Sequence, residues 1–168
     1  MGYNVKQSEQ RRIAGFHLVG PWEEKVKQGF QQLLLWVEHN QIQPLEWVSV
    51  YYDNPDEVPP EKLRCDVAIT VERDFQVPVN SAGVITTDIP GGHYAVMSAR
   101  VYNEDFEGSW NLFFDELLGD TSVQIGAGPC FEIYQNDGKG DGFWDIEMYI
   151  PVEPNAHKSR AGQKRPRE

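Results

Sequence analysis

The chain has few cysteines and no long apolar run. Cys65 and Cys130 are the only two cysteines in 168 residues, and neither has a second Cys or His at metal-site spacing. We therefore expect two buried thiols and no metal or cofactor. No segment reaches the roughly 18 apolar residues of a membrane span, and the start has no apolar stretch after its charges. We expect a soluble cytoplasmic protein without membrane contact.

Positive charge is scarce: 15 Lys and Arg residues stand against 26 Asp and Glu residues, a formal net charge of −11. The final segment, residues 154–168, holds five of the basic residues and one acid, so residues 1–153 carry a net charge of −15. Because nucleic-acid binding requires a positive surface, we do not expect the folded body to bind DNA directly. The basic tail lacks apolar residues and is expected to be disordered.

Motifs of the common catalytic classes are also missing. Four histidines are scattered along the chain, and no GxSxG, HExxH or phosphate-binding loop occurs. His17 and His93 lie in expected strands, where a surface histidine or one with a satisfied partner is the usual case. The sequence therefore favours a binding protein over an enzyme.

The sequence repeats one pattern of elements twice. Each copy has a short leading strand, a strand, a helix with one apolar stripe, and two further strands. The expected elements of the first copy are strands at 3–7, 13–19, 47–52 and 64–71 and a helix at 22–39; those of the second are strands at 84–88, 93–101, 129–135 and 143–152 and a helix at about 104–118, with Asn103 as its N-cap.

Several residue matches support the duplication, among them Tyr52 with Tyr134. We therefore predict one α+β domain over residues 1–153. It would consist of tandem strand-helix-strand-strand units, at about 3–72 and 82–152, with about eight antiparallel strands, two long helices on one face and a central groove.

The last strand of each copy predicts what faces that groove. In FWDIEMYIPV, residues 143–152, alternation places Trp144 and Ile146 under the helix and Glu147 on the opposite face, where the first copy has Ala68. If Phe131 also points to the helix, the groove contains two carboxylates among three tyrosines. The predicted ligand-binding residues are Glu147, Glu132, Tyr134, Tyr52 and Tyr149.

Aromatic faces around a partly desolvated acid suit a planar or cationic organic molecule. Two alternatives remain open at this point. The same face can be an ordinary solvated sheet surface, because antiparallel sheets often expose one side. The two glutamates can also form an acid and base pair.

Five stretches together resemble the GyrI-like family, which includes the bacterial DNA gyrase inhibitors. They are RIAGFHLVGPWEE, EWVSVYYDNPDEVPPEKLRCD, GGHYAV, PCFEIYQNDG and DGFWDIEMYIPV, and the resemblance runs from about residue 3 to 152. It implies a tandem fold with a central groove, binding to DNA gyrase with reduced supercoiling, and protection against gyrase-targeting toxins and DNA damage stress.

The wider family includes effector-binding domains of multidrug-responsive activators, in which a glutamate within an aromatic pocket meets cationic drugs. Glu147 resembles that glutamate. Some relatives hydrolyse electrophilic toxins with a tyrosine and a glutamate, for which Tyr134 and Glu147 are the nearest candidates. The resemblance thus implies a gyrase inhibitor first, a receptor or sequestering protein for cationic or aromatic drugs second, and a hydrolase third.

A contact with gyrase is expected on exposed charge and loops, outside the groove. The candidates lie in the acidic loop at 53–61 and the turn between the two copies; they are Asp53, Asp56, Glu57, Glu61, Gly91 and Gly92. The alternative is a solvated connector whose acids only aid solubility. We expect the protein to be a monomer.

Overall fold

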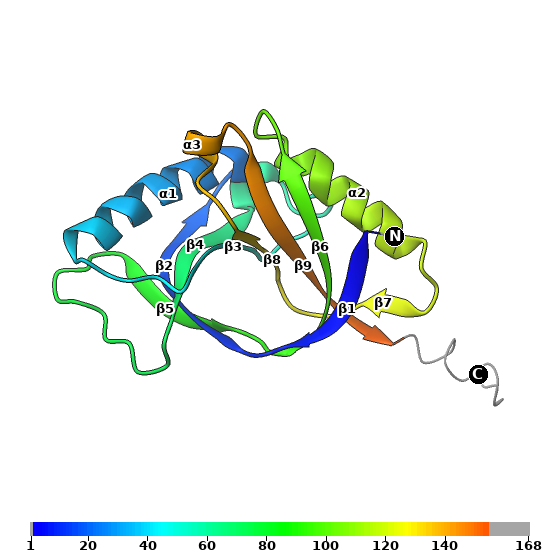
Figure 1. Cartoon of the computed structure of the whole chain (residues 1–168), viewed down its shortest axis with the longest axis horizontal. Helices are drawn as coiled ribbons and strands as arrows, with labels where there is room; N and C mark the ends of the chain where they lie inside the picture. The colour runs from blue at the N-terminus through cyan, green and yellow to red at the C-terminus, as the bar shows by residue number, and fades with distance from the viewer. Residues whose placement is uncertain (1, 155–168) are drawn as a thin grey trace.

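The computed structural model describes residues 2–154 of the chain. Nine strands and two long helices make up most of this part (Figure 1). In chain order the elements are β1 (Tyr3–Ser8), β2 (Arg11–Val19), α1 (Trp22–His39), β3 (Glu46–Tyr51), the 3-10 turn η1 (Pro60–Lys62), β4 (Arg64–Val71), β5 (Val84–Ile89), β6 (Gly92–Val101), α2 (Phe106–Leu118), β7 (Val123–Ile125), β8 (Cys130–Tyr134), α3 (Gly138–Asp141) and β9 (Trp144–Pro154).

The strands form one antiparallel sheet in the order β1-β6-β9-β8-β3-β4-β2-β5, with β7 paired to β9. The α+β class and the eight predicted strands are confirmed, and the short β7 was not predicted. The first copy of the repeated pattern forms one half of the domain, β1 to β4, and the second copy forms the other half, β5 to β9. The two halves meet at the central pair β3 and β8. Each leading strand pairs with the other half, because β1 lies beside β6 and β5 lies beside β2. The two halves are therefore tied together at the centre and at both edges.

Both long helices cover the same side of the sheet, which we call the helix face (Figure 1). Helix α1 packs Leu33, Trp36 and Val37 against a cluster that includes Val67 and Ile69 of β4. Helix α2 packs its apolar side chains against β6 and β9, in a cluster of Phe113, Leu117, Ala95, Met97, Ile146, Met148 and Ile150. Alternation along β4 and β9 therefore places these apolar residues under the helices, as predicted.

The opposite side of the sheet, which we call the inner face, has a buried cluster of its own. It joins side chains from seven strands: Ile13, Val48, Val50, Ala68, Ile89, Tyr94, Val96, Phe131, Ile133 and Tyr149. Strands near both ends of the sheet contribute, so the sheet curves around the cluster. The sequence predicts a groove on this face, and the structure fills most of that space with apolar side chains.

Helix α2 begins two residues later than predicted, at Phe106. Its N-cap is Asp105, whose carboxylate accepts a hydrogen bond from the Gly108 backbone at 3.0 Å, and the predicted cap Asn103 is wrong. Asn103 and Glu104 both have positive φ angles of 55° and 60°, which a helical N-cap does not adopt. The basic tail predicted to be disordered lies, apart from Pro154, outside the described residues.

Gly15 of β2 lies against β4 so closely that a side chain does not fit. A Cβ at this position would lie 2.3 Å from the Val67 carbonyl oxygen and 2.5 Å from the Ala68 Cα, both of them backbone atoms. We predict that Gly15→Ala lowers the free energy of unfolding by about 1–3 kcal/mol, the usual cost of overpacking. Urea denaturation measures this loss.

Gly140→Ala is the matched control, because its nearest neighbour would be an Asp137 oxygen at 3.9 Å. We expect a change within about 0.5 kcal/mol for this surface substitution. Equal stability of both variants and the wild type would contradict the close approach of β2 and β4.

Candidate functional site

Strand β8 presents its side chains in the opposite sense to the prediction. Directly paired residues of neighbouring strands share a face, and Ile133 pairs with Glu147 while Glu132 pairs with Met148. Glu132 and Tyr134 therefore lie on the helix face, and Phe131 and Ile133 lie on the inner face. The prediction that Glu132 and Tyr134 face the same groove as Glu147 is wrong.

The physical reason is a shift of one residue. The match of Tyr52 with Tyr134 assumes that both face the same way, but Tyr52 contacts the inner cluster while Tyr51 faces the helices. Tyr51 is therefore the counterpart of Tyr134. A shift by one residue moves every side chain of a strand to the other face. Phe131 and Ile133 are also part of the inner cluster. The prediction of a polar groove on this face assumed instead that Phe131 points to the helix.

The inner face retains Tyr149, Glu147 and Tyr52 from the predicted set. The Tyr149 ring stacks on Phe131 with 4.4 Å between centroids, and the Arg11 guanidinium lies 5.1 Å from the Tyr149 centroid. A protein cation therefore already occupies the aromatic surface that the sequence assigned to a ligand. Tyr149 itself is 2% exposed, which leaves little of its ring available.

Glu147 lies at the rim of the inner face and is half-buried. It accepts a long hydrogen bond of 3.3 Å from the Tyr149 hydroxyl. A shallow pocket of about 450 Å³ adjoins it; the lining residues are Ser98, Ala99, Arg100, Gln135, Asp145, Ile146 and Glu147. Arg100 and Asp145 form an ion pair there, at 2.8 Å. The pocket is therefore mixed in charge and has no aromatic lining.

Glu132 is the most unusual polar residue of the helix face. Its side chain is only 1% exposed, in the centre of the sheet and under both helices. Its two carboxylate oxygens accept three hydrogen bonds, from Trp110 Nε1 at 2.7 Å, from the Tyr51 hydroxyl at 2.8 Å and from the Tyr134 hydroxyl. All three donors are neutral. In the ionised form of this carboxylate, nothing in these contacts balances the negative charge.

Aromatic rings from both helices pack against the two tyrosines that bind this carboxylate. Phe30 of α1 and Phe106 of α2 lie edge-on to the Tyr134 ring, at 5.1 and 6.3 Å between centroids. Trp22 of α1 and Trp110 of α2 approach the Tyr51 ring, at 4.8 and 6.0 Å. The four helix rings are each half-buried, so part of their surface reaches solvent. We call Glu132, Tyr51, Tyr134, Trp22, Phe30, Phe106 and Trp110 the Glu132 site.

Burial controls the proton affinities at the Glu132 site. Desolvation raises the pKa of Glu132 above the ordinary value of 4.5, and its three hydrogen bonds oppose this rise. Desolvation, reinforced by the neighbouring Glu132 charge, also holds the pKa of Tyr51 and Tyr134 well above 10. Both tyrosines therefore stay protonated and act as donors. A cation placed among these rings would supply the missing counter-charge and gain cation–π contacts.

Sequence reasoning named Glu132 and Tyr134 but missed the partners Tyr51, Trp110 and Ser49. The Ser49 hydroxyl lies 2.8 Å from that of Tyr134. Trp110 lies in the helix predicted at about 104–118, where the sequence pattern makes it one residue of the apolar stripe. Its indole N–H was the available signal, because a buried tryptophan needs an acceptor.

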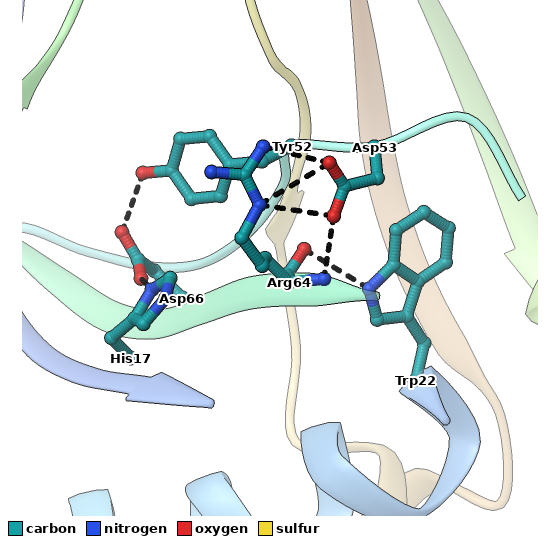
Figure 2. A network of polar contacts seen from close by, with 6 residues as sticks. All are labelled: His17, Trp22, Tyr52, Asp53, Arg64 and Asp66. Atoms are coloured by element: carbon teal, nitrogen blue, oxygen red, sulfur yellow. Dashed lines mark hydrogen bonds and ion pairs between the residues drawn. The ribbon is translucent and has the colours of Figure 1, made fainter. Parts of the chain in front are cut away.

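The predicted partner loop is held at its base by the contacts in Figure 2. Arg64 at the start of β4 makes a two-pronged ion pair with Asp53, with a shortest distance of 2.7 Å, and its backbone N–H also donates to Asp53. The guanidinium lowers the pKa of Asp53. Next to this pair, the buried Asp66 carboxylate accepts from the Tyr52 hydroxyl and bonds to His17 Nδ1 at 2.7 Å. Tyr52 thus has a structural role.

The candidate partner residues do not form one surface. Asp56, Glu57 and Glu61 are exposed, whereas the Asp53 side chain is only 10% exposed and is paired. Gly91 and Gly92 lie at the other end of β2: Val19 pairs with Arg64 beside the loop, and Arg11 pairs with Ile89 next to the turn. Eight residues of strand separate these points by about 26 Å.

Within residues 2–154 no group of three or more His, Cys, Asp or Glu side chains lies together as a metal site would require. In the same part of the chain, no helix has the length and apolar character needed to cross a membrane. Burial raises the pKa of both cysteine thiols to about 12. Neither thiol is therefore an activated nucleophile.

Sequence comparisons connect the chain with a known family. The model of the GyrI-like small molecule binding domain matches residues 1–153. A DNA gyrase inhibitor of Citrobacter koseri is 60% identical over 153 residues, 91% of this chain and 99% of that protein. A DNA gyrase inhibitor of Escherichia coli is 57% identical over 157 residues, 94% of this chain and all of that protein.

Solved structures share the fold at low sequence identity. SAV2435 bound to tetraphenylphosphonium has a TM-score of 0.67 at 14% identity, over 96% of this chain and 99% of that one. A hydrolase from Listeria innocua has a TM-score of 0.58 at 8% identity, over 90% and 91% of the two chains. The same curved sheet with two helices therefore occurs in proteins described by different activities.

The raised pKa of Glu132 predicts a pH-dependent stability. Above pH 4.5 the unfolded glutamate loses its proton before the folded one does, so ionisation favours the unfolded chain. The contribution of Glu132 to the free energy of unfolding is therefore most favourable below pH 4.5, and it declines as the pH rises through the pKa of Glu132 in the folded protein. We predict that the wild type loses stability relative to Glu132→Gln over this rise, as measured by urea denaturation at several pH values.

The glutamine variant cannot titrate at this position, and all other acids are common to both proteins. A constant stability difference from pH 4.5 to 8 would contradict the raised pKa.

Proposed function

The chain belongs to the GyrI-like family, and we propose that it is a DNA gyrase inhibitor, which binds gyrase and lowers its supercoiling activity. The observation that carries this proposal is the high identity to proteins of that name over almost the whole chain. In the cell this activity would protect against gyrase-targeting toxins and DNA damage stress. We place the protein in the cytoplasm, as a monomer.

Charge supports an action on the enzyme and not on DNA. Residues 1–153 carry a net charge of −15, which repels the phosphates of a duplex. A gyrase holds DNA on a positive surface, and such a surface attracts an acidic protein. We therefore expect the protein to bind the enzyme, and we expect its inhibition of supercoiling to weaken as salt screens the charged contact.

The acidic loop between β3 and β4 is our candidate for this contact. Turns fix its backbone: Asn54 accepts hydrogen bonds from the backbone of Asp56 and Glu57, and the Asp53–Arg64 pair closes its base. A loop held in one conformation loses little entropy on binding. Asp56, Glu57 and Glu61 present its charge to solvent, while Asp53 holds the loop in place.

We predict that neutralising the exposed acids, in the variant Asp56→Asn/Glu57→Gln/Glu61→Gln, weakens inhibition of supercoiling at least about tenfold, because it removes three charges from the contact. The dose of protein needed for half-inhibition in a gel-based supercoiling assay measures this. The matched control is Glu23→Gln/Glu24→Gln/Glu38→Gln, which removes three exposed acids from α1.

If both triple variants inhibit like the wild type, the loop is not the contact. If both weaken equally, the effect comes from overall charge and not from the loop. Tight binding of a duplex by the wild type in a mobility-shift assay would contradict the action on gyrase.

A second function is favoured by the Glu132 site: binding of a cationic aromatic compound. The observation that carries it is a buried carboxylate with three neutral donors among half-buried rings. The family model describes small-molecule binding, and SAV2435 binds tetraphenylphosphonium. Receptor or sequestering activity fits these groups better than hydrolysis, because both thiols and the Tyr134 hydroxyl have raised pKa values that disfavour a nucleophile.

We predict that tetraphenylphosphonium binds the wild type and that Glu132→Gln weakens it by about 1–3 kcal/mol, because the ligand loses its charged partner. Isothermal titration calorimetry at neutral pH measures both affinities. Glu147→Gln is the control: it removes the same charge from the shallow pocket on the inner face.

The two variants assign the ligand to one face of the sheet. If only Glu147→Gln weakens the binding of tetraphenylphosphonium, the ligand binds on the inner face, where the sequence pattern predicts it. Affinities unaffected by either substitution would exclude both glutamates.

A further inference from the structure

Ser49 occupies a special position with respect to Glu132. The two residues pair directly across β3 and β8, the central strands where the two halves meet. Both lie on the helix face, with exposures of 0% for Ser49 and 1% for Glu132. The two halves thus place a hydroxyl and a carboxylate side by side beneath the same rings.

Ser49 is also connected to the carboxylate by hydrogen bonds. Its hydroxyl lies 2.8 Å from that of Tyr134, which in turn donates to Glu132. Because Tyr134 has one proton to donate and uses it on Glu132, the Ser49 hydroxyl donates to Tyr134. Ser49 therefore orients the tyrosine without adding charge.

The charge of this region sets a limit on the ligand. Five polar residues of the described chain are buried. Ser49 and Glu132 lie on the helix face. Ser8, Asp66 and Thr70 lie on the inner face, because Asp66 and Thr70 alternate with Cys65, Val67 and Ile69, and Ser8 lies on the same side of β1 as Lys6, which pairs with Tyr94 of the inner cluster. One positive charge on a ligand is balanced by Glu132. A second positive charge beside it would be buried without a partner, which is unfavourable.

We propose that Ser49 is a specificity-determining residue, which, as a neutral partner of Glu132, restricts the site to ligands with a single positive charge. This inference rests on the cation binding proposed for the Glu132 site. An acid at position 49 would place a second carboxylate beside the first and admit a dication.

Two probes of nearly the same shape test this. N-methyl-phenylpyridinium has two linked aromatic rings and one charge, and methyl viologen has two linked rings and two charges. We expect the wild type to bind the monocation at least about tenfold more tightly in calorimetry. Ser49→Asp should shift this ratio at least about tenfold towards the dication, while the uncharged isostere Ser49→Asn should leave the ratio unchanged.

Equal affinity of the wild type for both probes overturns the charge limit. Equal ratios in Ser49→Asp and Ser49→Asn overturn the role of Ser49, although cation binding would stand. Binding of neither probe, nor of tetraphenylphosphonium, overturns the cation site together with this inference and leaves gyrase inhibition as a separate result.

A second variant covers the case in which two buried acids prevent Ser49→Asp from folding. Ser49→Asp/Glu132→Gln moves the single carboxylate across the strand pair. Because one charge remains, the preference for the monocation should persist, and a preference for the dication would contradict the argument. Circular dichroism verifies the fold of each variant.

Discussion

The buried carboxylate of Glu132 is the constraint around which the centre of this protein is organised. A charge in this position is unfavourable unless donors surround it, and the structure supplies Trp110, Tyr51 and Tyr134 from α2, β3 and β8. These contacts require the Trp110 side chain of α2 to reach the carboxylate and require β3 and β8 to pair in one register. The residue that costs stability by its burial therefore also links the two halves through Tyr51 of β3, and it is the group that the proposed cation would contact.

The two proposed activities use separate parts of the molecule. The acidic loop is exposed and is held at its base by Asp53 and Arg64, as Figure 2 shows. The Glu132 carboxylate is buried beneath the helices, whose aromatic rings are half-buried. The two regions nevertheless share β3, since Tyr51 binds Glu132 while the next residue, Tyr52, binds Asp66 beside the loop. A ligand that moves Tyr51 therefore acts on a strand that leads directly into the loop.

Much of the fold could be predicted from the sequence, because alternation and helical stripes are local signals. Strand β4 and helix α1 have the predicted bounds, and the apolar residues of β9 pack under α2 as expected. The direction in which the side chains of β8 point could not be predicted, because both faces of this strand are buried. Phe131 and Glu132 point to opposite faces and both are shielded from solvent, so the polarity of a residue does not indicate its face. Glu132 was named in the sequence but was placed on the wrong face. Its indole and hydroxyl partners come from distant segments, so only the tertiary structure brings them together.

A crystal structure of the protein with tetraphenylphosphonium bound tests cation binding at the Glu132 site most directly. We expect density for the cation between α1 and α2, against the rings of Phe106 and Trp110 and within reach of the Glu132 carboxylate. Accommodating it would displace one or more of the half-buried helix rings. Density on the inner face beside Glu147 and Tyr149, with the Glu132 site unchanged, would contradict cation binding at Glu132.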